Sequence, residues 1–142
     1  MTKLSWFGVI FSFFLLLVPA AVQAQDEKPD EWQVSISGQI QAFRDKNAPV
    51  ALSFATQPFK DNYESPEQFF IAIIASGYSP IMESRSHSFG PFKVLEPGVV
   101  MQDVKFVGND QSLYEAIYQM TKEADGWHVG GVQLVKTTGV GV

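Results

Sequence analysis

The sequence of 142 residues contains no cysteine and only two histidines. A thiol nucleophile, a cysteine metal site and disulfides are therefore excluded, so a folded domain must be stable through its hydrophobic core alone. A zinc site needs three or four converging ligands, and nothing near His87 or His128 in the sequence offers that spacing. We therefore expect neither a metal nor another cofactor. The sequence also lacks a glycine-rich phosphate loop and a nucleophile-elbow motif.

The longest apolar run lies close to the N-terminus and is short for a membrane-spanning helix, which needs about 20 apolar residues. Lys3 precedes this run, and residues 6–18 carry no charge. Val22 and Ala24 are small residues at the two positions that signal peptidase reads. We therefore predict that residues 1–24 are a signal peptide cleaved after Ala24, and that the protein is periplasmic. No cysteine follows the run, so a lipid anchor is excluded, and we expect no stable membrane attachment after cleavage.

Positive charge is scarce in the chain that would remain after cleavage. Lys3 is the only basic residue of the first 24, which leaves 9 Lys and Arg against 15 Asp and Glu, a formal net charge of −6. A chain with this balance repels phosphate backbones, so nucleic acid is not an expected partner.

The mature chain divides into a helical first half and a strand-like second half, which favours an α+β fold over alternating βαβ units. We expect a polar N-terminal segment at residues 25–31, a single α+β domain at 32–136 and a flexible tail at 137–142. No internal repeat interrupts this organisation.

Three helices are predicted. Asp30 is expected to cap the first helix, whose apolar stripe is Trp32, Ile36, Ile40 and Phe43, with Gly38 weakening it. Asn47 and Pro49 start a second, shorter helix.

The third helix has the clearest signals at both ends. Ser65 is its predicted N-cap, Pro66 its first residue and Gln68 the partner in a capping box, while Gly77 closes it. Because apolar residues cover most of its circumference, we expect it to be the most buried helix.

Four strands rich in Val, Phe, Tyr and Ile are predicted at residues 84–93, 99–107, 111–122 and 127–136. Their connections are short, so neighbouring strands should form antiparallel hairpins. Gly130 and Gly131 inside the last strand indicate a bulge that would help to curl the sheet. Three helices followed by a curled meander describe a cone with a hollow between the helices and the sheet.

Several segments together resemble one bacterial family of exported proteins. They are QIQAF at residues 39–43, SPEQF at 65–69, GY at 77–78, YQM at 118–120, DGW at 125–127 and GVQL at 131–134. This resemblance, which spans residues 32–134, is to the family catalogued as domain of unknown function 4864, which resembles the nuclear-transport-factor-2-like (cystatin-like cone) superfamily. It implies three helices packed on a curved four-stranded sheet. The family has no established activity, and such cones host isomerases, dehydratases, ligand binders and dimerisation modules, so the fold does not choose among them.

Three residues are candidates for a ligand pocket inside the cone: Tyr78, Gln102 and Tyr118. Strand alternation places Gln102 on the inner face, beside Tyr118 if that residue also points inward, and Tyr78 at the rim. In the alternative interpretation, Gln102 and Tyr118 only satisfy each other's hydrogen bonds in the core. Asp103 alternates with Gln102 and is expected to be a surface charge rather than a catalytic base.

Two neighbouring residues of the last strand have opposite expected roles. Trp127 should anchor the last hairpin against the helices, and His128 should therefore face outward. No catalytic residue is assigned.

The preferred interpretation is a non-enzymatic module that binds a small apolar ligand in the cone or forms a homodimer. Val99, Met101 and Val107 would lie on the outer face of the sheet, through which the chain could pair. The alternative is an isomerase, dehydratase or hydrolase with a polar pocket, which needs a carboxylate or histidine at the hollow.

Overall fold

A computed structural model of the protein describes residues 28–140, with side chains up to Thr137, so the predicted signal peptide lies outside the described residues. Within that range five helices precede four strands, which confirms the α+β fold. The helices are α3 (Pro29–Arg44), α4 (Ala48–Ser53), α5 (Gln57–Lys60), α6 (Pro66–Ala75) and α7 (Ser79–Met82). The strands are β1 (Ser86–Glu96), β2 (Val99–Val107), β3 (Ser112–Glu123) and β4 (Gly126–Val140). The single-turn helices α5 and α7 were not predicted.

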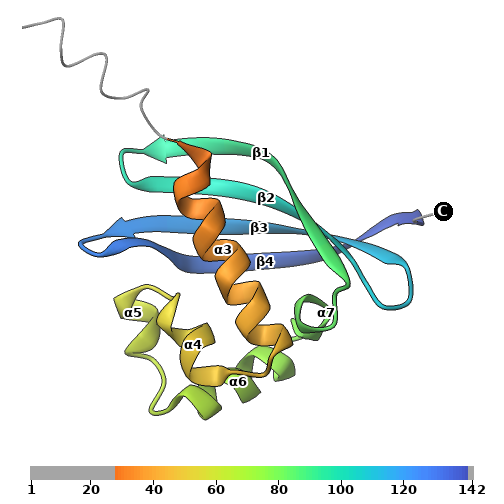
Figure 1. Ribbon diagram of the computed structural model, residues 1–142, viewed down its shortest axis with the longest axis horizontal. Coiled ribbons are helices and arrows are strands. Elements are labelled where there is room, and N and C mark those ends of the chain that lie inside the picture. The colour runs from red at the N-terminus through yellow and green to blue at the C-terminus, as the bar shows by residue number, and fades with distance from the viewer. Residues whose placement is uncertain (1–27, 141–142) are drawn as a thin grey trace, which may run out of the picture.

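The four strands form one antiparallel sheet in the order β1-β2-β3-β4, as the short connections predicted (Figure 1). Gln119 pairs with Gly131 and Met120 with Val129, so Gly130 is an extra residue in β4. This confirms the predicted bulge. A second irregularity, between Phe89 and Phe92 of β1, was not predicted. Bulges of this kind bend a strand and increase its twist.

Helix α3 crosses one face of the sheet (Figure 1) and carries the predicted stripe. Trp32, Ile36 and Ile40 have no exposed surface. The predicted cap is wrong, because Lys28 is the N-cap and Pro29 takes the first helical position. Asp30 instead lies in the first turn, where its charge interacts favourably with the helix dipole.

Gly38 of α3 has a packing role in addition to its weak helix propensity. A Cβ atom at this position would lie 2.5 Å from Cζ of Phe54, the residue that follows α4. Glycine therefore allows the Phe54 ring to pack directly on the α3 backbone.

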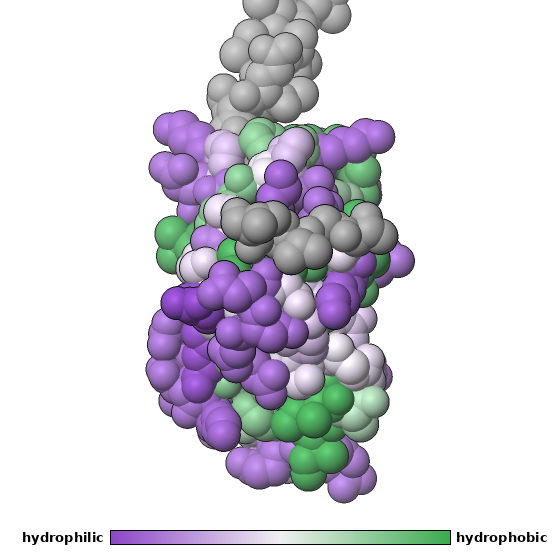
Figure 2. All heavy atoms as spheres, turned by 90° about the vertical axis from the view of Figure 1, so that its right-hand side faces the viewer, coloured by the Kyte–Doolittle hydropathy of each residue, from purple (hydrophilic) through white to green (hydrophobic). Residues whose placement is uncertain are grey.

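Helix α6 begins as predicted, since the Ser65 hydroxyl accepts the Gln68 N–H at 3.1 Å. Gly77 follows its end with φ +94°. The expectation that this helix is the most buried is wrong: only Phe69 of α6 is buried, whereas Ile71 is 67% exposed. The helix lies below α3 at one end of the molecule, away from the middle of the sheet (Figure 1), so only one side of it is covered. Figure 2 shows an apolar area at this lower end.

Both ends of the folded unit extend beyond the predicted limits. Helix α3 begins at Pro29, which lies in the segment 25–31 that we expected to precede the domain. Strand β4 continues to Val140, into the expected tail, and the Thr137 hydroxyl donates to the Leu113 carbonyl at 3.0 Å. Among the described residues, none of the helices has the length and apolar character needed to cross a membrane.

The connection between α4 and α5 pairs with the free edge of β4. Val129 N–H donates to the Phe54 carbonyl at 2.7 Å, and Thr56 N–H donates to the Val129 carbonyl at 3.0 Å. Ala55 and Val129 thereby form a parallel β-bridge. This short segment protects an edge that would otherwise be open to other strands, and it brings the helices next to β4.

Candidate functional site

A cavity of ≈ 250 Å³ lies between the helices and the inner face of the sheet. Its helical side includes the aromatic rings of Phe59, Tyr63 and Phe69, and its sheet side includes Tyr118, Val129 and Val132. Edge-to-face contacts of Phe69 with Phe59 and Tyr63 hold these three rings together, with the Tyr63 and Phe69 centroids 5.4 Å apart. The lining is therefore largely apolar and aromatic, as in most small-molecule sites.

Exposure separates the floor of this cavity from its mouth. Gln39, Phe69 and Tyr118 are buried, whereas Ser76 is exposed and Tyr78 is partly exposed. Ser76 and Tyr78 follow α6, so the cavity opens where this helix ends and runs inward to α3 and β3.

Tyr118 is one of the buried polar residues that line the cavity. The side chain has no exposed surface, and its hydroxyl makes no hydrogen bond within the described part of the chain. Burial raises the pKa of the Tyr118 phenol far above its ordinary value, while the charge of Arg44 opposes this shift. The group stays protonated, and an unpaired buried hydroxyl costs about 1–3 kcal/mol. A ligand with an acceptor atom would remove that cost.

Tyr78 lines the cavity from the turn between α6 and α7. Its hydroxyl donates to the Val132 carbonyl of β4 at 2.8 Å. Tyr78 is therefore a partly exposed lining residue that holds the end of α6 against the sheet.

Gln102 lies directly opposite Tyr118 in the strand register, but it is not part of the cavity lining. Its side-chain oxygen accepts the Trp32 indole N–H at 2.8 Å and the Gln33 amide at 3.1 Å. Its nitrogen donates to the Gly90 and Asp103 carbonyls. The amide of Gln102 is therefore bonded to α3 and to the irregular part of β1, and not to Tyr118 as the alternative interpretation expected.

Sequence reasoning did not single out Gln39 as a lining residue. This residue of α3 is 3% exposed, lies in the cavity wall and donates from its amide nitrogen to the Ala51 carbonyl at 3.0 Å. The signal was present: Gln39 follows Ile36 by three positions and so lies on the buried stripe of a helix.

The residues that line the cavity include no carboxylate, histidine or basic side chain. Asp103 lies on the opposite face of β2 from the buried Gln102 and Val104, as predicted, and is partly exposed. An acid–base catalyst of the type that the enzymatic alternative requires is therefore missing from this cavity.

His87 lies outside the cavity, next to a serine. Its Nε2 is 3.0 Å from Ser37 Oγ, and its Nδ1 is 3.4 Å from the Arg44 guanidinium. Arginine only donates, so Nδ1 accepts, and Nε2 carries the proton that is donated to Ser37. Burial, and then the charge of Arg44, lower the pKa of His87. In this tautomer His87 does not take a proton from Ser37, so the pair is not a nucleophile and its base.

Trp127 anchors the last hairpin against α3. Its ring meets Trp32 edge to face at a centroid distance of 5.2 Å, and its indole N–H donates to Glu31 at 3.3 Å. The prediction for this residue is confirmed.

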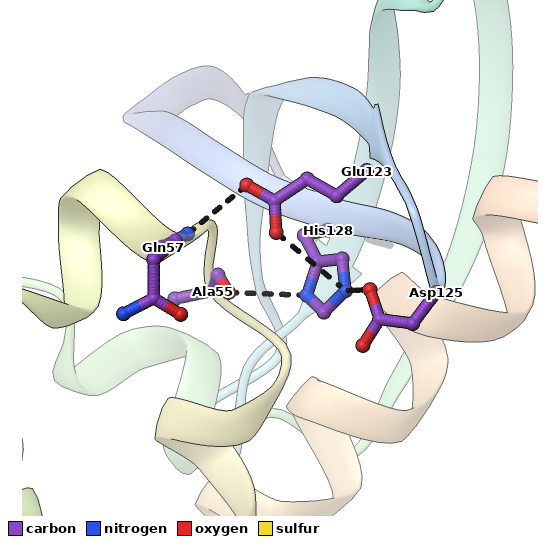
Figure 3. A network of polar contacts seen from close by, with 5 residues as sticks. All are labelled: Ala55, Gln57, Glu123, Asp125 and His128. Atoms are coloured by element: carbon purple, nitrogen blue, oxygen red, sulfur yellow. Dashed lines mark hydrogen bonds and ion pairs between the residues drawn. The ribbon is translucent and has the colours of Figure 1, made fainter.

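The prediction that His128 faces outward is wrong. The Ala55 segment and the β3–β4 turn cover its ring, and only 8% of the residue is exposed. Nδ1 lies 3.1 Å from the Ala55 carbonyl, and Nε2 lies 2.8 Å from Asp125 Oδ1 and 3.8 Å from Glu123 Oε1 (Figure 3). The hydrogen bond from His128, and next its charge, lower the pKa of Asp125.

This grouping also corrects the expectation that no ligand set gathers at either histidine, since the three side chains offer ligand atoms within 4.8 Å of one another. The sequence feature that could have indicated this grouping is the pair of acidic residues, Glu123 and Asp125, in the predicted turn shortly before His128.

A family model described as "Domain of unknown function (DUF4864)" matches residues 25–142, which include the whole of the described structure. No curated protein matches the sequence.

Proposed function

The chain belongs to the family described as Domain of unknown function (DUF4864), and we propose that it is a non-enzymatic module that binds a small, mostly apolar molecule between its helices and its sheet. One observation carries this proposal: a cavity of ≈ 250 Å³ has an apolar, aromatic lining that includes Tyr118, whose buried hydroxyl has no hydrogen-bond partner among the described residues. Such a combination of an apolar surface and one polar group is typical of small-molecule sites.

Cavity size and lining limit the class of ligand. An engineered apolar cavity of about 150 Å³ holds benzene, so this larger cavity suits a single ring with a short substituent or a branched chain of similar volume. The Tyr118 hydroxyl would donate to an uncharged acceptor, such as a carbonyl or ether oxygen. An ionised ligand is disfavoured, because the lining offers no opposite charge to offset its desolvation.

The same lining favours binding over catalysis. An isomerase, dehydratase or hydrolase would need a group that exchanges protons near neutral pH. Tyr118 is the most buried polar group of the cavity, and burial raises the pKa of its phenol away from that range. The enzymatic alternative therefore receives no support from this site.

We place this activity in the periplasm, after cleavage of residues 1–24, and we assign the domain to the cone type of the nuclear-transport-factor-2-like superfamily. The signal peptide is supported by the order of three features in residues 1–24: the basic Lys3, the uncharged apolar run at 6–18 and the small residues Val22 and Ala24. The irregularities at Gly130 of β4 and between Phe89 and Phe92 of β1 support a curved sheet.

The test is to purify the mature chain from its own periplasm under native conditions and to analyse an organic extract by mass spectrometry. Ala72 lines the cavity from α6, so Ala72→Phe fills part of it. Ala75 lies on the exposed side of the same helix, so Ala75→Phe is the matched control. The proposal expects an uncharged compound enriched with the wild type and with Ala75→Phe, but not with Ala72→Phe. Equal extracts from all three proteins would contradict it.

A homodimer through the outer face of the sheet is the second candidate. Ile117 and Val135 are 40% and 54% exposed on that face, and Val99, Met101 and Val107 are partly exposed there. Apolar side chains exposed on one face of a sheet can pair with those of a second copy. Sedimentation equilibrium at micromolar concentration would show a doubled mass that Ile117→Lys abolishes, whereas a monomeric wild type would rule out the dimer.

A further inference from the structure

Both ring nitrogens of His128 face oxygen atoms that accept hydrogen bonds. The Ala55 carbonyl lies at Nδ1, and the Asp125 and Glu123 carboxylates lie at Nε2. A neutral imidazole has only one N–H, and the backbone carbonyl requires it on Nδ1. The other ring nitrogen, Nε2, then belongs to a group of three potential ligand atoms, with one oxygen each from Asp125 and Glu123, that lie within 4.8 Å of one another.

We propose that Glu123, Asp125 and His128 form a binding site for a divalent transition-metal ion, with Zn²⁺ as the reference ion. Two ligands that each lie about 2.1 Å from one ion are about 3.0–3.4 Å apart in octahedral or tetrahedral geometry. The distances from Nε2 of His128 to Asp125 Oδ1 and Glu123 Oε1 are 2.8 Å and 3.8 Å, on either side of that range. Small side-chain rotations would bring the three atoms onto one ion.

Two of the three ligands are held in place by contacts that leave the ligand atom available. His128 is buried, and the Ala55 carbonyl fixes its ring through Nδ1, as is usual for metal-bound histidine. Glu123 uses Oε2 to accept the Gln57 N–H at 3.0 Å, so its Oε1 faces His128 (Figure 3). These fixed contacts distinguish the site from an ordinary cluster of surface acids.

The ligand types indicate which ions fit. One imidazole nitrogen and two carboxylates suit Zn²⁺, Mn²⁺ or Fe²⁺, whereas Mg²⁺ and Ca²⁺ prefer oxygen ligands alone. A neutral imidazole and two carboxylates also balance the charge of a divalent ion. Asp125 is 76% exposed through its side chain, so further coordination positions are open to water.

The site adjoins the cavity without belonging to it. Ala55 and Val129 line the cavity, while the Ala55 carbonyl and the residue before Val129 form part of the ion site. The inference does not rest on ligand binding in the cavity, and the two are tested separately.

The experiment is a calorimetric titration of the mature chain, without a histidine tag and after treatment with a chelator, with Zn²⁺. The expected result is saturable binding of one ion per chain. Asp125→Asn and His128→Asn should each weaken that affinity at least tenfold. Asparagine at position 128 retains a donor for the Ala55 carbonyl, and Asp125 is exposed, so both variants should fold, as circular dichroism would verify.

His87→Asn is the matched control, because it removes the other histidine and should leave Zn²⁺ binding unchanged. Co²⁺ provides a second readout: its visible absorption bands in the wild type should change in His128→Asn and persist in His87→Asn. The inference is overturned by a wild type that binds no ion at millimolar Zn²⁺, or by an affinity that Asp125→Asn and His128→Asn leave unaltered.

Discussion

Ala55 and Val129 form a parallel β-bridge between the segment after α4 and the edge of β4. Both residues line the cavity, and the Ala55 carbonyl also accepts from His128. This one contact therefore lies between the apolar cavity and the proposed ion site, and it holds α5, with the ring of Phe59, next to β4.

Replacing Tyr118 with Phe should remove the selectivity for ligands that accept a hydrogen bond without lowering the stability of the free protein. In the free protein the variant should be as stable as the wild type or up to about 2 kcal/mol more stable, because it removes an unpaired buried hydroxyl. Urea unfolding measures this difference. The wild type should prefer acetophenone, which has a carbonyl, over ethylbenzene, and the variant should lose that preference. A variant that keeps it would show that Tyr118 makes no hydrogen bond to the ligand.

Gln102→Leu should destabilise the fold by about 3 kcal/mol, since the indole N–H of Trp32 and two backbone carbonyls would be left without partners. Urea unfolding again provides the measurement. Gln119→Leu, on the exposed outer face of β3, is the control and should change stability by no more than about 0.5 kcal/mol. Equal effects of the two variants would refute the structural role assigned to Gln102.

The register of Gln102 opposite Tyr118 was predictable, because a short hairpin fixes the pairing of β2 with β3. Its absence from the cavity was not, since that depends on Trp32 of α3 reaching the amide across the core. The burial of α6 was overestimated for a related reason: apolar composition does not reveal that the helix lies at one end of the molecule. His128 was expected to face outward because it alternates with Trp127, and the segment around Ala55 that covers it is distant in the sequence.

Lowering the pH should destabilise the protein through His87. The folded chain has a lowered pKa at His87, so below about pH 6.5 the unfolded chain binds a proton that the folded chain does not. This stabilising contribution is complete above pH 6.5 and decreases as the pH falls through the pKa of the folded state. Thermal unfolding of His87→Gln should show a smaller loss of stability across that range. Parallel pH profiles for the two proteins would contradict the assignment.

Gly38→Ala tests the close contact with Phe54. Alanine favours a helix over glycine by about 1 kcal/mol, but its Cβ would meet the Phe54 ring. We therefore expect Gly38→Ala to be more stabilising in a Phe54→Ala background than in the wild type, with a coupling energy above about 0.5 kcal/mol in a double-mutant cycle. Additive effects on the free energy of unfolding would mean that the ring yields without cost.

Methyl NMR of the mature chain titrated with acetophenone measures whether the cavity binds a small uncharged molecule. We expect saturable shifts at the lining methyl groups of Ile73, Val129 and Val132, with little change at the exposed methyl groups of Ile71 and Val135. Unshifted lining residues, or equal shifts at both sets of methyl groups, would contradict it.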